Sequence, residues 1–349
     1  MWTIALRNVQ FRRRQFLLAV VGTALVFAMA LLVTGIREGF RTEAARILDG
    51  MGGETWAVSS SGSGPFTGTE PMPMSVADDL GREAGVRRAD PVLIGSRNVR
   101  LGDEFRSVHV IGYRVGGLGA PPPEQGRRVA ASGEVVVDSK LGVDLGRSLN
   151  IAGRQFEVVG RVSDRTYYGG TPTAYIPIED AQAMAFKGMP LITAVVMEGR
   201  PLHAPDGLKI MSGAQVQADL LRPLGTADRS INTTRILLWI VAAVIVGAVM
   251  YMSALERVRD FAVLKAVGGQ TRVLVTSLAF EAMVACLLAA GIAVACAQLL
   301  SPTIPLPITL TAGAYAALPL VAVVVGVVAS LFGVRRAVRT DPALAFSGA

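Results

Sequence analysis

Charged residues are missing from three long stretches of the chain, and these stretches dominate its pattern. No Asp, Glu, Lys or Arg occurs at positions 15–36, 236–255 or 282–334, which are 22, 20 and 53 residues long. A helix needs about 20 apolar residues to cross a hydrocarbon core about 30 Å thick. The first two stretches therefore predict one membrane-spanning helix each. The third predicts two, because three prolines at positions 302–307 interrupt any continuous helix there.

The predicted fold is an α-helical membrane protein with four transmembrane helices and a mixed α/β extracytoplasmic domain between the first two. A cleaved signal peptide is the alternative for the first helix, since a basic cluster precedes it and Ala28-Met29-Ala30 resembles a cleavage site. Its apolar run is longer than a signal core of about 7–15 residues, which favours a retained span. The segments are a cytoplasmic amphipathic N-terminal segment (1–15), spans at 16–36, 236–255, 276–300 and 313–334, the extracytoplasmic domain with a helical stalk (37–235), a cytoplasmic loop (256–272), a short external loop (301–312) and a cytoplasmic tail (335–349).

Composition and charge agree with this topology. The chain is 51% hydrophobic and 17% charged, with a mean hydropathy of +0.46, whereas soluble domains carry about 25% charged residues. Residues 37–235 hold 23 basic and 23 acidic groups, so the net charge of +7 comes from the segments next to the spans. Basic excess beside apolar spans marks the cytoplasmic side. With 30 Arg against 4 Lys, we expect a bacterial protein of the cytoplasmic (inner) membrane with both termini cytoplasmic.

The domain at 37–235 has helical and strand patterns. Apolar residues continue at helical spacing to Met51, which predicts that the first helix extends beyond the lipid as a stalk; a separate amphipathic helix on the bilayer surface is the alternative. Turn residues at 59–73 predict a mobile loop. Strands are expected at 134–138, 148–151, 155–162, 173–176 and 192–197, with a hairpin turn at Ala152-Gly153 and helices at 179–186 and 214–221.

Catalytic chemistry has no candidate in this sequence. There is no Gly-Lys dipeptide, so no P-loop can be formed. His109 and His203 are isolated, and Cys286 and Cys296 lie in the third predicted span, which argues against a metal site. Basic residues do not cluster with aromatic residues as in nucleic-acid binding. We therefore expect no catalytic residue, no metal, no nucleic-acid partner and no cofactor bound by the chain itself.

The cytoplasmic loop is the most distinctive segment. Apolar residues recur there at helical spacing, charged residues occupy the other side, and Gly268-Gly269 ends the pattern. A basic helix resting on anionic lipid is one interpretation. A docking helix for a cytoplasmic protein is the other.

Here the sequence resembles the FtsX-like permease family, which includes the MacB, LolC, LolE and DevC-type permeases, the transmembrane subunits of type VII ABC transporters. The resemblance is carried by Glu256-Arg257, Asp260, Leu264–Gly269 and Phe280-Glu281-Ala282, by the two ends at 5–9 and 335–345, and by 133–162 and 174–182, which resemble the MacB-like periplasmic core domain. Asp260 departs from the pattern, because the family commonly has Glu there.

The resemblance implies a non-enzymatic permease subunit that couples ATP hydrolysis to movement of its extracytoplasmic domain, for export or extraction of a substrate. Its partners would be two copies of a cytoplasmic ABC ATPase, which holds ATP and Mg, a second copy of the chain or a related permease, membrane lipid, and possible extracytoplasmic adaptor or effector proteins. The residues implied to couple to the ATPase are Glu256, Arg257, Asp260, Phe261, Leu264, Lys265 and Gly268.

Two other functions remain open. The chain would otherwise be a signalling or regulatory subunit acting on an extracellular partner such as a cell-wall hydrolase, or a subunit for amino-acid import.

Within the spans, Ala24/Ala28 and Ala243/Gly247 are small-xxx-small pairs that predict a helix contact in a dimer. Glu281 either begins the third span or projects into the cytoplasm.

Overall fold

The protein consists of two compact units. A computed structural model describes residues 13–102, 104–256, 271–304 and 306–338. Unit 1 comprises Met1–Glu38, Ala227–Ile304 and Ile308–Ala349, and unit 2 comprises Gly39–Thr226 and Pro305–Pro307.

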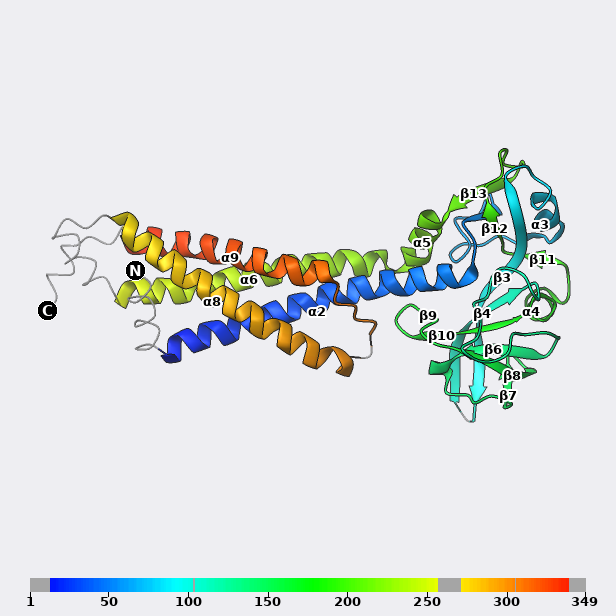
Figure 1. Cartoon of the computed structure of the whole chain (residues 1–349), viewed down its shortest axis with the longest axis horizontal. Helices are drawn as coiled ribbons and strands as arrows, with labels where there is room; N and C mark the ends of the chain where they lie inside the picture. The colour runs from blue at the N-terminus through cyan, green and yellow to red at the C-terminus, as the bar shows by residue number, and fades with distance from the viewer. Residues whose placement is uncertain (1–12, 103, 257–270, 305, 339–349) are drawn as a thin grey trace, which may run out of the picture. The chain divides into compact units, whose positions relative to one another are not determined.

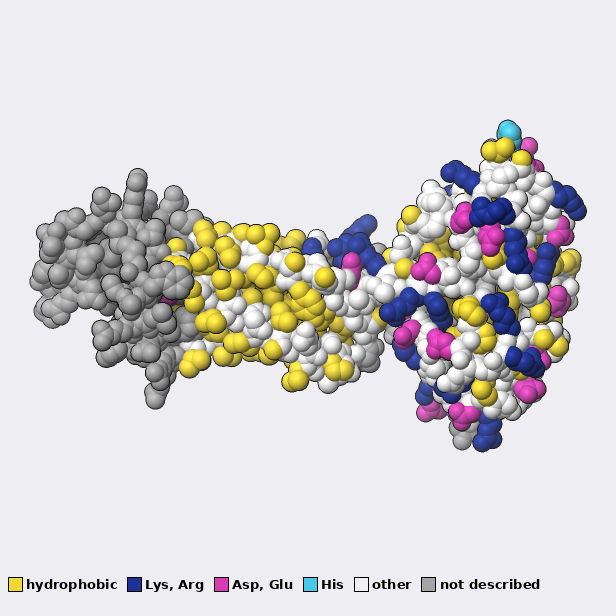
Figure 2. All heavy atoms as spheres, viewed as in Figure 1, with side chains coloured by type: hydrophobic (Ala, Val, Ile, Leu, Met, Phe, Trp, Pro, Cys, Tyr) yellow, Lys and Arg dark blue, Asp and Glu magenta, His cyan; other side chains and the backbone are white. Residues whose placement is uncertain are grey.

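Unit 1 is built from apolar helices. Its described elements are the first part of α2 (Arg13–Met51), most of α6 (Gly225–Glu256), α8 (Thr271–Leu300) and α9 (Ala312–Val338) (Figure 1). Figure 2 shows apolar side chains spread over the surfaces of these helices. Among the described residues, three helical stretches are long and apolar enough to cross a membrane, at Val20–Met51, Arg229–Val249 and Ala279–Thr303, and a shorter apolar stretch covers Ala312–Val328.

The helices of unit 1 pack closely through small side chains. On α8, the residues facing the interior are 0–4% exposed, and nearly all of them are alanine: Ala282, Ala285, Cys286, Ala289, Ala290, Ala293 and Ala297. Gly326 of α9 lies so near α8 that a Cβ there would sit 3.3 Å from the Ala282 carbonyl oxygen. Small residues allow helix backbones to approach closely, which stabilises helix pairs in lipid through van der Waals contact.

The helices start earlier than the apolar runs. Helix α6 begins at Gly225 rather than at 236, and α8 begins at Thr271 rather than at 276. Hydropathy identifies only the part of a helix that suits lipid, while polar residues such as those at 225–235 continue the same helix outside it.

Helix α2 is continuous from Arg13 to Met51. The predicted extension of the first apolar helix is therefore correct, and a separate surface helix is excluded. Helix α2 ends where Gly52 adopts φ +76°, with its N–H bonded to the Asp49 carbonyl at 3.2 Å. A glycine in the left-handed region is a common helix terminator, because it lacks the Cβ that disfavours this conformation.

Unit 2 is organised around one mixed β-sheet (Figure 1). The strand order is β13-β1-β12-β3-β4-β10-β6-β8-β5, with β7 beside β3 and β8, β9 beside β10, and β2 and β11 forming a separate pair. The strands are β1 (Thr55–Ser59), β2 (Met72–Pro73), β3 (Val86–Leu101), β4 (Glu104–Tyr113), β5 (Gln125–Gly126), β6 (Glu134–Asp138), β7 (Ser148–Ile151), β8 (Arg154–Val162), β9 (Thr166–Tyr167), β10 (Thr171–Pro177), β11 (Leu191–Ile192), β12 (Ala194–Gly199) and β13 (Leu208–Ser212).

Helices cover both faces of this sheet. The last turns of α2 and helix α5 (Gly213–Leu221) pack on one face, where Ile47, Trp56 and Tyr175 belong to a single apolar core. Helices α3 (Ser75–Leu80) and α4 (Ile178–Phe186) pack on the other face, over two further apolar cores. Side chains of successive strand residues point to opposite faces, so a sheet covered on both sides needs strands that are apolar on both faces.

The predicted strands and helices of unit 2 are present, with ends that shift by up to two residues for most of them. The Ala152-Gly153 turn is confirmed: these residues have φ +49° and +88° and join β7 to β8, where Ile151 pairs with Arg154. Two central residues with positive φ are typical of the type I′ turn, which suits the twist of a hairpin. The sequence does not predict strands β1, β3, β4 and β13, or the two-residue strands β2, β5, β9 and β11.

Candidate functional site

Two helical segments lead into and out of the sheet of unit 2, and both pack on the same face. They are the end of α2 from Gly39 onward and α5, which precedes α6. Ala44 and Ile47 of α2, with Val216 and Leu220 of α5, are at most 2% exposed within one core. We call these two segments, with the loops that bond to them, the junction.

A buried carboxylate fixes α2 at the junction. Glu43 is 7% exposed, and its Oε1 accepts a hydrogen bond from the Thr166 hydroxyl in β9. Its Oε2 accepts a second bond from the Gly169 N–H at 3.1 Å. Burial raises the pKa of Glu43, and the bond from Thr166 partly offsets this rise by stabilising the charged form.

A second set of bonds ties the next turn of α2 to the same loop. The Arg165 guanidinium donates to the Arg46 carbonyl, and Arg46 forms an ion pair with Asp164 at 3.7 Å. The Arg165 N–H in turn donates to Asp138 Oδ2 at 2.6 Å, at the end of β6. Burial raises the pKa of Asp138, opposed by this bond and by one from the Lys140 N–H. The segment 164–169 is therefore attached to both α2 and the sheet.

Asp219 gives α5 its own attachment. This residue is 0% exposed, and its carboxylate accepts bonds from the Phe66 N–H at 2.9 Å, the Thr67 N–H at 3.2 Å and the Thr67 hydroxyl. Arg222 compensates its charge, with Nη2 at 3.2 Å from Oδ1. The loop at 59–73 is thus bonded to α5 at Phe66 and Thr67, and its mobility stays a prediction.

The two helical segments are also linked directly. Gln217 of α5 donates from Nε2 to the Arg41 carbonyl of α2 at 3.1 Å. Helix α5 is held in place at its start by a capping box, in which Ser212 and Gln215 satisfy each other's backbone N–H groups. A displacement of α2 would therefore act on α5 as well as on the sheet.

Aromatic rings connect the junction to the sheet. Phe66 lies between Trp56 and Tyr167, with ring centroids 5.9 and 5.8 Å away, and His109 stacks on Tyr167 at 4.3 Å. Burial lowers the pKa of His109 to about 4, so the imidazole is neutral at neutral pH. Burial also raises the pKa of Tyr167 well above its ordinary range. The stacked rings of His109 and Tyr167 are therefore both uncharged at neutral pH.

The predicted coupling residues lie almost entirely outside the described residues. Glu256 is the last residue of α6. The others, Arg257, Asp260, Phe261, Leu264, Lys265 and Gly268, fall in the segment 257–270, which the structure does not describe. Their role stays a prediction.

The small-residue pairs have different surroundings. Ala24 and Ala28 are 1% and 4% exposed and pack inside the helical core of unit 1, so the contact they make is within this chain. Ala243 and Gly247 on α6 are half-buried and stay candidates for a contact with a second copy. Glu281 is half-buried on α8, inside the apolar stretch Ala279–Thr303 rather than before it.

Sequence reasoning did not identify Glu43 and Asp219 as important residues. Glu43 lies three residues after Phe40 and four before Ile47, hence on the apolar side of α2. A carboxylate at that position is costly unless it is hydrogen-bonded, and this was the available signal. The loop residues that donate to Asp219 are more than 150 positions away, so the sequence next to Asp219 does not indicate them.

Comparison with known proteins decides the family. Residues 16–201 match the MacB-like periplasmic core domain, and residues 233–342 match the FtsX-like permease C-terminal domain. The uncharacterized ABC transporter permease Rv2563 of Mycobacterium tuberculosis is 41% identical over 344 residues, which cover 99% of both chains. The chain belongs to the FtsX-like ABC transporter permease family. The uncharacterized ABC transporter permeases Mb2592 of Mycobacterium bovis and Rv0072 of M. tuberculosis are 41% and 40% identical to this permease over the same length.

Two solved structures resemble part of the permease. The periplasmic region of MacB from Actinobacillus actinomycetemcomitans is 17% identical, with a TM-score of 0.36, over 48% of this chain and 92% of that one. The extracellular domain of the noncanonic ABC-type transporter YknZ from Gram-positive bacteria is 14% identical, with a TM-score of 0.33, over 41% and 90%. Family membership rests on the sequence matches, and with the apolar helices it makes this chain a membrane protein and an ABC transporter permease subunit.

Proposed function

We propose that this permease converts ATP hydrolysis by a separate cytoplasmic ATPase into movement of unit 2, for export or extraction of a substrate. The observation that carries the proposal is the course of α2. One unbroken helix contains an apolar stretch long enough to span a membrane, and its last turns are part of the core of unit 2. Any displacement of this helix along or about its axis would move Glu43 and strain its bonds to Thr166 and Gly169.

The junction suits the transmission of force. Apolar packing alone lets surfaces slide, whereas the bonds of Glu43, Arg165 and Gln217 have defined directions and fix α2 in register with its neighbours. The second helical segment, α5, is attached through Asp219 on the same sheet face. Because α5 leads into α6, we propose that α2 and α6 act on unit 2 together.

The proposed topology has four spans, with both termini and the 256–272 loop in the cytoplasm and unit 2 outside the bacterial cytoplasmic membrane. The charge pattern supports it, since the flanking segments are basic and residues 37–235 are neutral overall. In this topology the 256–272 loop would face the ATPase. A dimer of permeases with two ATPases completes the proposed assembly, because ABC ATPases act in pairs at a shared interface in the type VII arrangement that the family resemblance implies.

The first experiment is affinity purification of the tagged permease in mild detergent, with identification of the proteins that remain bound. Co-purification of a P-loop ATPase whose activity rises with the permease present would support the proposal. Recovery of an extracellular protein without any ATPase would contradict it and favour the regulatory alternative.

A second experiment tests movement itself. Hydrogen exchange of the peptide spanning 164–170 is compared in the permease–ATPase complex with ATP and with ADP. We expect a nucleotide-dependent difference in the wild type that disappears in Glu43→Ala, while ATPase binding is retained. If the wild type shows the same hydrogen exchange at 164–170 with ATP and with ADP, transmission through α2 is contradicted.

A further inference from the structure

The segment between α8 and α9 is attached to α2 as well. Its described residues are Ile304 and 306–311, here called the connector, and they form neither helix nor strand. The connector joins the end of α8 to the start of α9, two helices that pack on each other through small residues (Figure 1). Pro305–Pro307 belong to unit 2, and the chain from Ile308 onward belongs to unit 1. Neither the family matches nor the junction gives the connector a role.

Within unit 1 the connector is fixed to α2 at Gly35. The Thr309 N–H donates a hydrogen bond to the Gly35 carbonyl at 2.9 Å. A Cβ on Gly35 would lie 2.8 Å from Ile308 Cγ2 and 2.9 Å from Leu310 Cδ2. These distances are shorter than the usual contact of about 3.5–4.0 Å between carbon atoms. A side chain at Gly35 would therefore push the connector away from α2.

A second glycine of α2 shows that this close approach is specific to Gly35. Glycine is unfavourable in a helix interior, because it loses more conformational freedom than other residues, and close approach of another group is a common reason for its presence. A Cβ on Gly22 would lie 3.8 Å from Ile245 Cγ2, which is an ordinary contact. Gly22 could thus be replaced by alanine without displacing its neighbours, whereas Gly35 could not.

Within unit 2 the connector lies against the turn that Glu43 holds. A Cβ on Gly169 would be 3.3 Å from Phe40 Cε1 and 3.5 Å from Leu306 Cδ2, so both side chains border this turn. The N–H of the same glycine donates to Glu43 Oε2 at 3.1 Å. A displacement of Leu306 would therefore change the packing of the turn whose N–H holds Glu43.

The chain between these two contacts is short and stiff. Only Pro307 separates Leu306 from Ile308. The proline ring fixes its own φ near about −65°, and it restricts the residue before it to extended conformations. Leu306 and Ile308 therefore have little freedom to move independently of each other, and a shift of one is passed to the other.

We propose that the connector is a second transmission element of this permease, with Gly35 and Leu306 as its positioning residues. Helices α8 and α9 are closely packed, so they move together, and the connector carries their movement to the turn at Gly169. This inference rests on the proposed function and deepens it, because it adds α8 and α9 to the helices that act on unit 2.

The first test measures amide hydrogen exchange of the full permease in nanodiscs, without nucleotide or ATPase. Gly35→Ala should speed exchange of the 306–311 peptide about tenfold, as expected for loss of one hydrogen bond, and should also speed exchange of the 164–170 peptide. Leu306→Ala should speed exchange at 164–170, and it tests the second contact even if Gly35→Ala does not fold. Gly22→Ala is the matched control on the same helix and should leave both peptides unchanged.

The double variant Gly35→Ala/Leu306→Ala separates the connector from α2 itself. If Gly35 acts through Leu306, the double variant should exchange at 164–170 no faster than Leu306→Ala alone. Full addition of the two effects would mean that Gly35 acts along α2, and this would overturn the proposal. Unchanged exchange at 164–170 in Leu306→Ala, or equal acceleration in Gly22→Ala, would overturn it as well.

A second readout, with the ATPase bound, distinguishes transmission from packing alone. Leu306→Ala should reduce the difference in 164–170 exchange between ATP and ADP while the ATPase rate stays as in wild type. A full difference in this variant would overturn the transmission role of the connector. Absence of any difference in the wild type would instead contradict the proposed function, and the nucleotide-free comparison would still decide whether the connector links Gly35 to the turn at Gly169.

Discussion

Glu43 of α2 and Thr166 of β9 are joined by a buried hydrogen bond across 123 positions of the chain. The carboxylate also accepts a hydrogen bond from the Gly169 N–H. One side chain therefore attaches the end of α2 to β9 and to the turn that follows it. Buried acceptors of this kind are expensive to lose, because their donors are left without partners. The predictions that follow start from this contact.

Glu43→Ala should loosen the attachment of α2. The substitution leaves the Thr166 hydroxyl and the Gly169 N–H without their acceptor, which costs about 1–3 kcal/mol. Hydrogen exchange of the 164–170 peptide should accelerate. Thr166→Val should give a smaller effect, and the double variant should be less destabilised than the sum of the two, because the two side chains share one interaction. Strict additivity would show that the bond contributes nothing.

Glu43 also predicts a pH dependence. Its pKa is raised in the folded state by burial, so between the ordinary value of 4.5 and the folded pKa the folded state binds more protons than the unfolded state. The contribution of Glu43 to stability should therefore fall as pH rises through this window and stay constant above it. Glu43→Gln should remove this dependence, which can be checked by comparing exchange-derived opening free energies of α2 across pH. The same slope in the variant would rule out Glu43 as its source.

His109 should give stability the opposite pH dependence to that of Glu43. Its pKa is about 4 in the folded state, against 6.5 ordinarily, so below pH 6.5 the unfolded state binds the proton more readily. Stability should fall as pH decreases from about 6.5 to about 4, by at most about 3 kcal/mol. His109→Phe keeps a ring against Tyr167 but has no proton to gain. In this variant the amide hydrogen exchange of β4, corrected for the intrinsic exchange rate, should therefore vary less with pH than in wild type.

Asp219 predicts a local effect on the loop it holds. Asp219→Ala removes the acceptor of the Phe66 and Thr67 N–H groups, which costs about 1–3 kcal/mol, and leaves the half-exposed Arg222 without its carboxylate. Limited proteolysis should cut the 59–73 loop faster. Asp79→Ala is the matched control, since Asp79 pairs with Arg82 where both side chains are largely exposed. Equal protease sensitivity in the two variants would contradict the role of Asp219.

The helices and one hairpin of this permease follow from local pattern, while its central strands do not. The hairpin at Ala152-Gly153 is encoded by adjacent residues, and the apolar runs encode the long helices by length. Strand β3 combines the short apolar run Val92–Ile94 with a proline and several charged residues, and Asp90 within it is 3% exposed. Its carboxylate accepts bonds from Arg88 and from the Leu118 N–H, at 2.6 and 2.9 Å. Leu118 is 28 positions away from Asp90, so the local sequence pattern around β3 does not indicate this bond.

The same distinction separates the two parts of the candidate site. The 256–272 loop was identified because its residues are contiguous and resemble a family signature, whereas the junction is assembled from α2, β9 and α5, far apart in sequence. Glu43 could have been recognised as a carboxylate on the apolar side of a helix. Its partner Thr166 could not, since nothing near it in sequence indicates that it meets α2.

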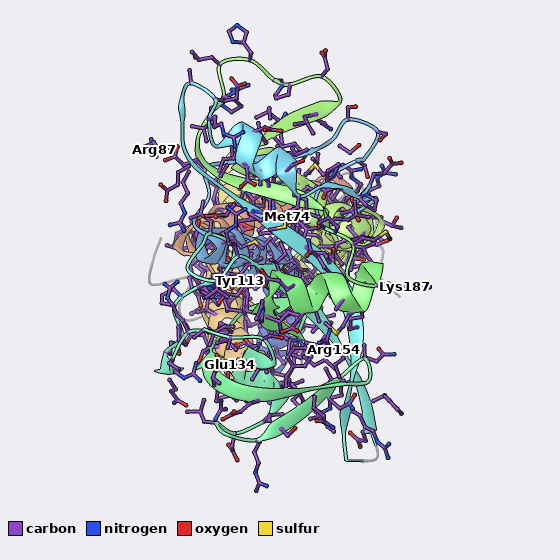
Figure 3. All side chains as sticks on the ribbon, turned by 90° about the vertical axis from the view of Figure 1, so that its right-hand side faces the viewer. Met74, Arg87, Tyr113, Glu134, Arg154 and Lys187 are labelled. Atoms are coloured by element: carbon purple, nitrogen blue, oxygen red, sulfur yellow. The ribbon has the colours of Figure 1, made fainter. Side chains whose placement is uncertain are left out.

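The coupling loop gives the last prediction. If residues 256–269 dock on an ATPase through opposite charges, Asp260→Lys together with Lys265→Glu should abolish stimulation of ATPase activity by the permease while leaving its membrane insertion intact. Charge reversal in a contact is more disruptive than truncation, because like charges are brought together. Lys187→Glu, a single reversal at the end of α4 (Figure 3), is the control and should leave stimulation unchanged, since this residue belongs to unit 2. Full stimulation in the double variant would exclude the loop as the coupling element and leave interaction with anionic lipid as its better interpretation.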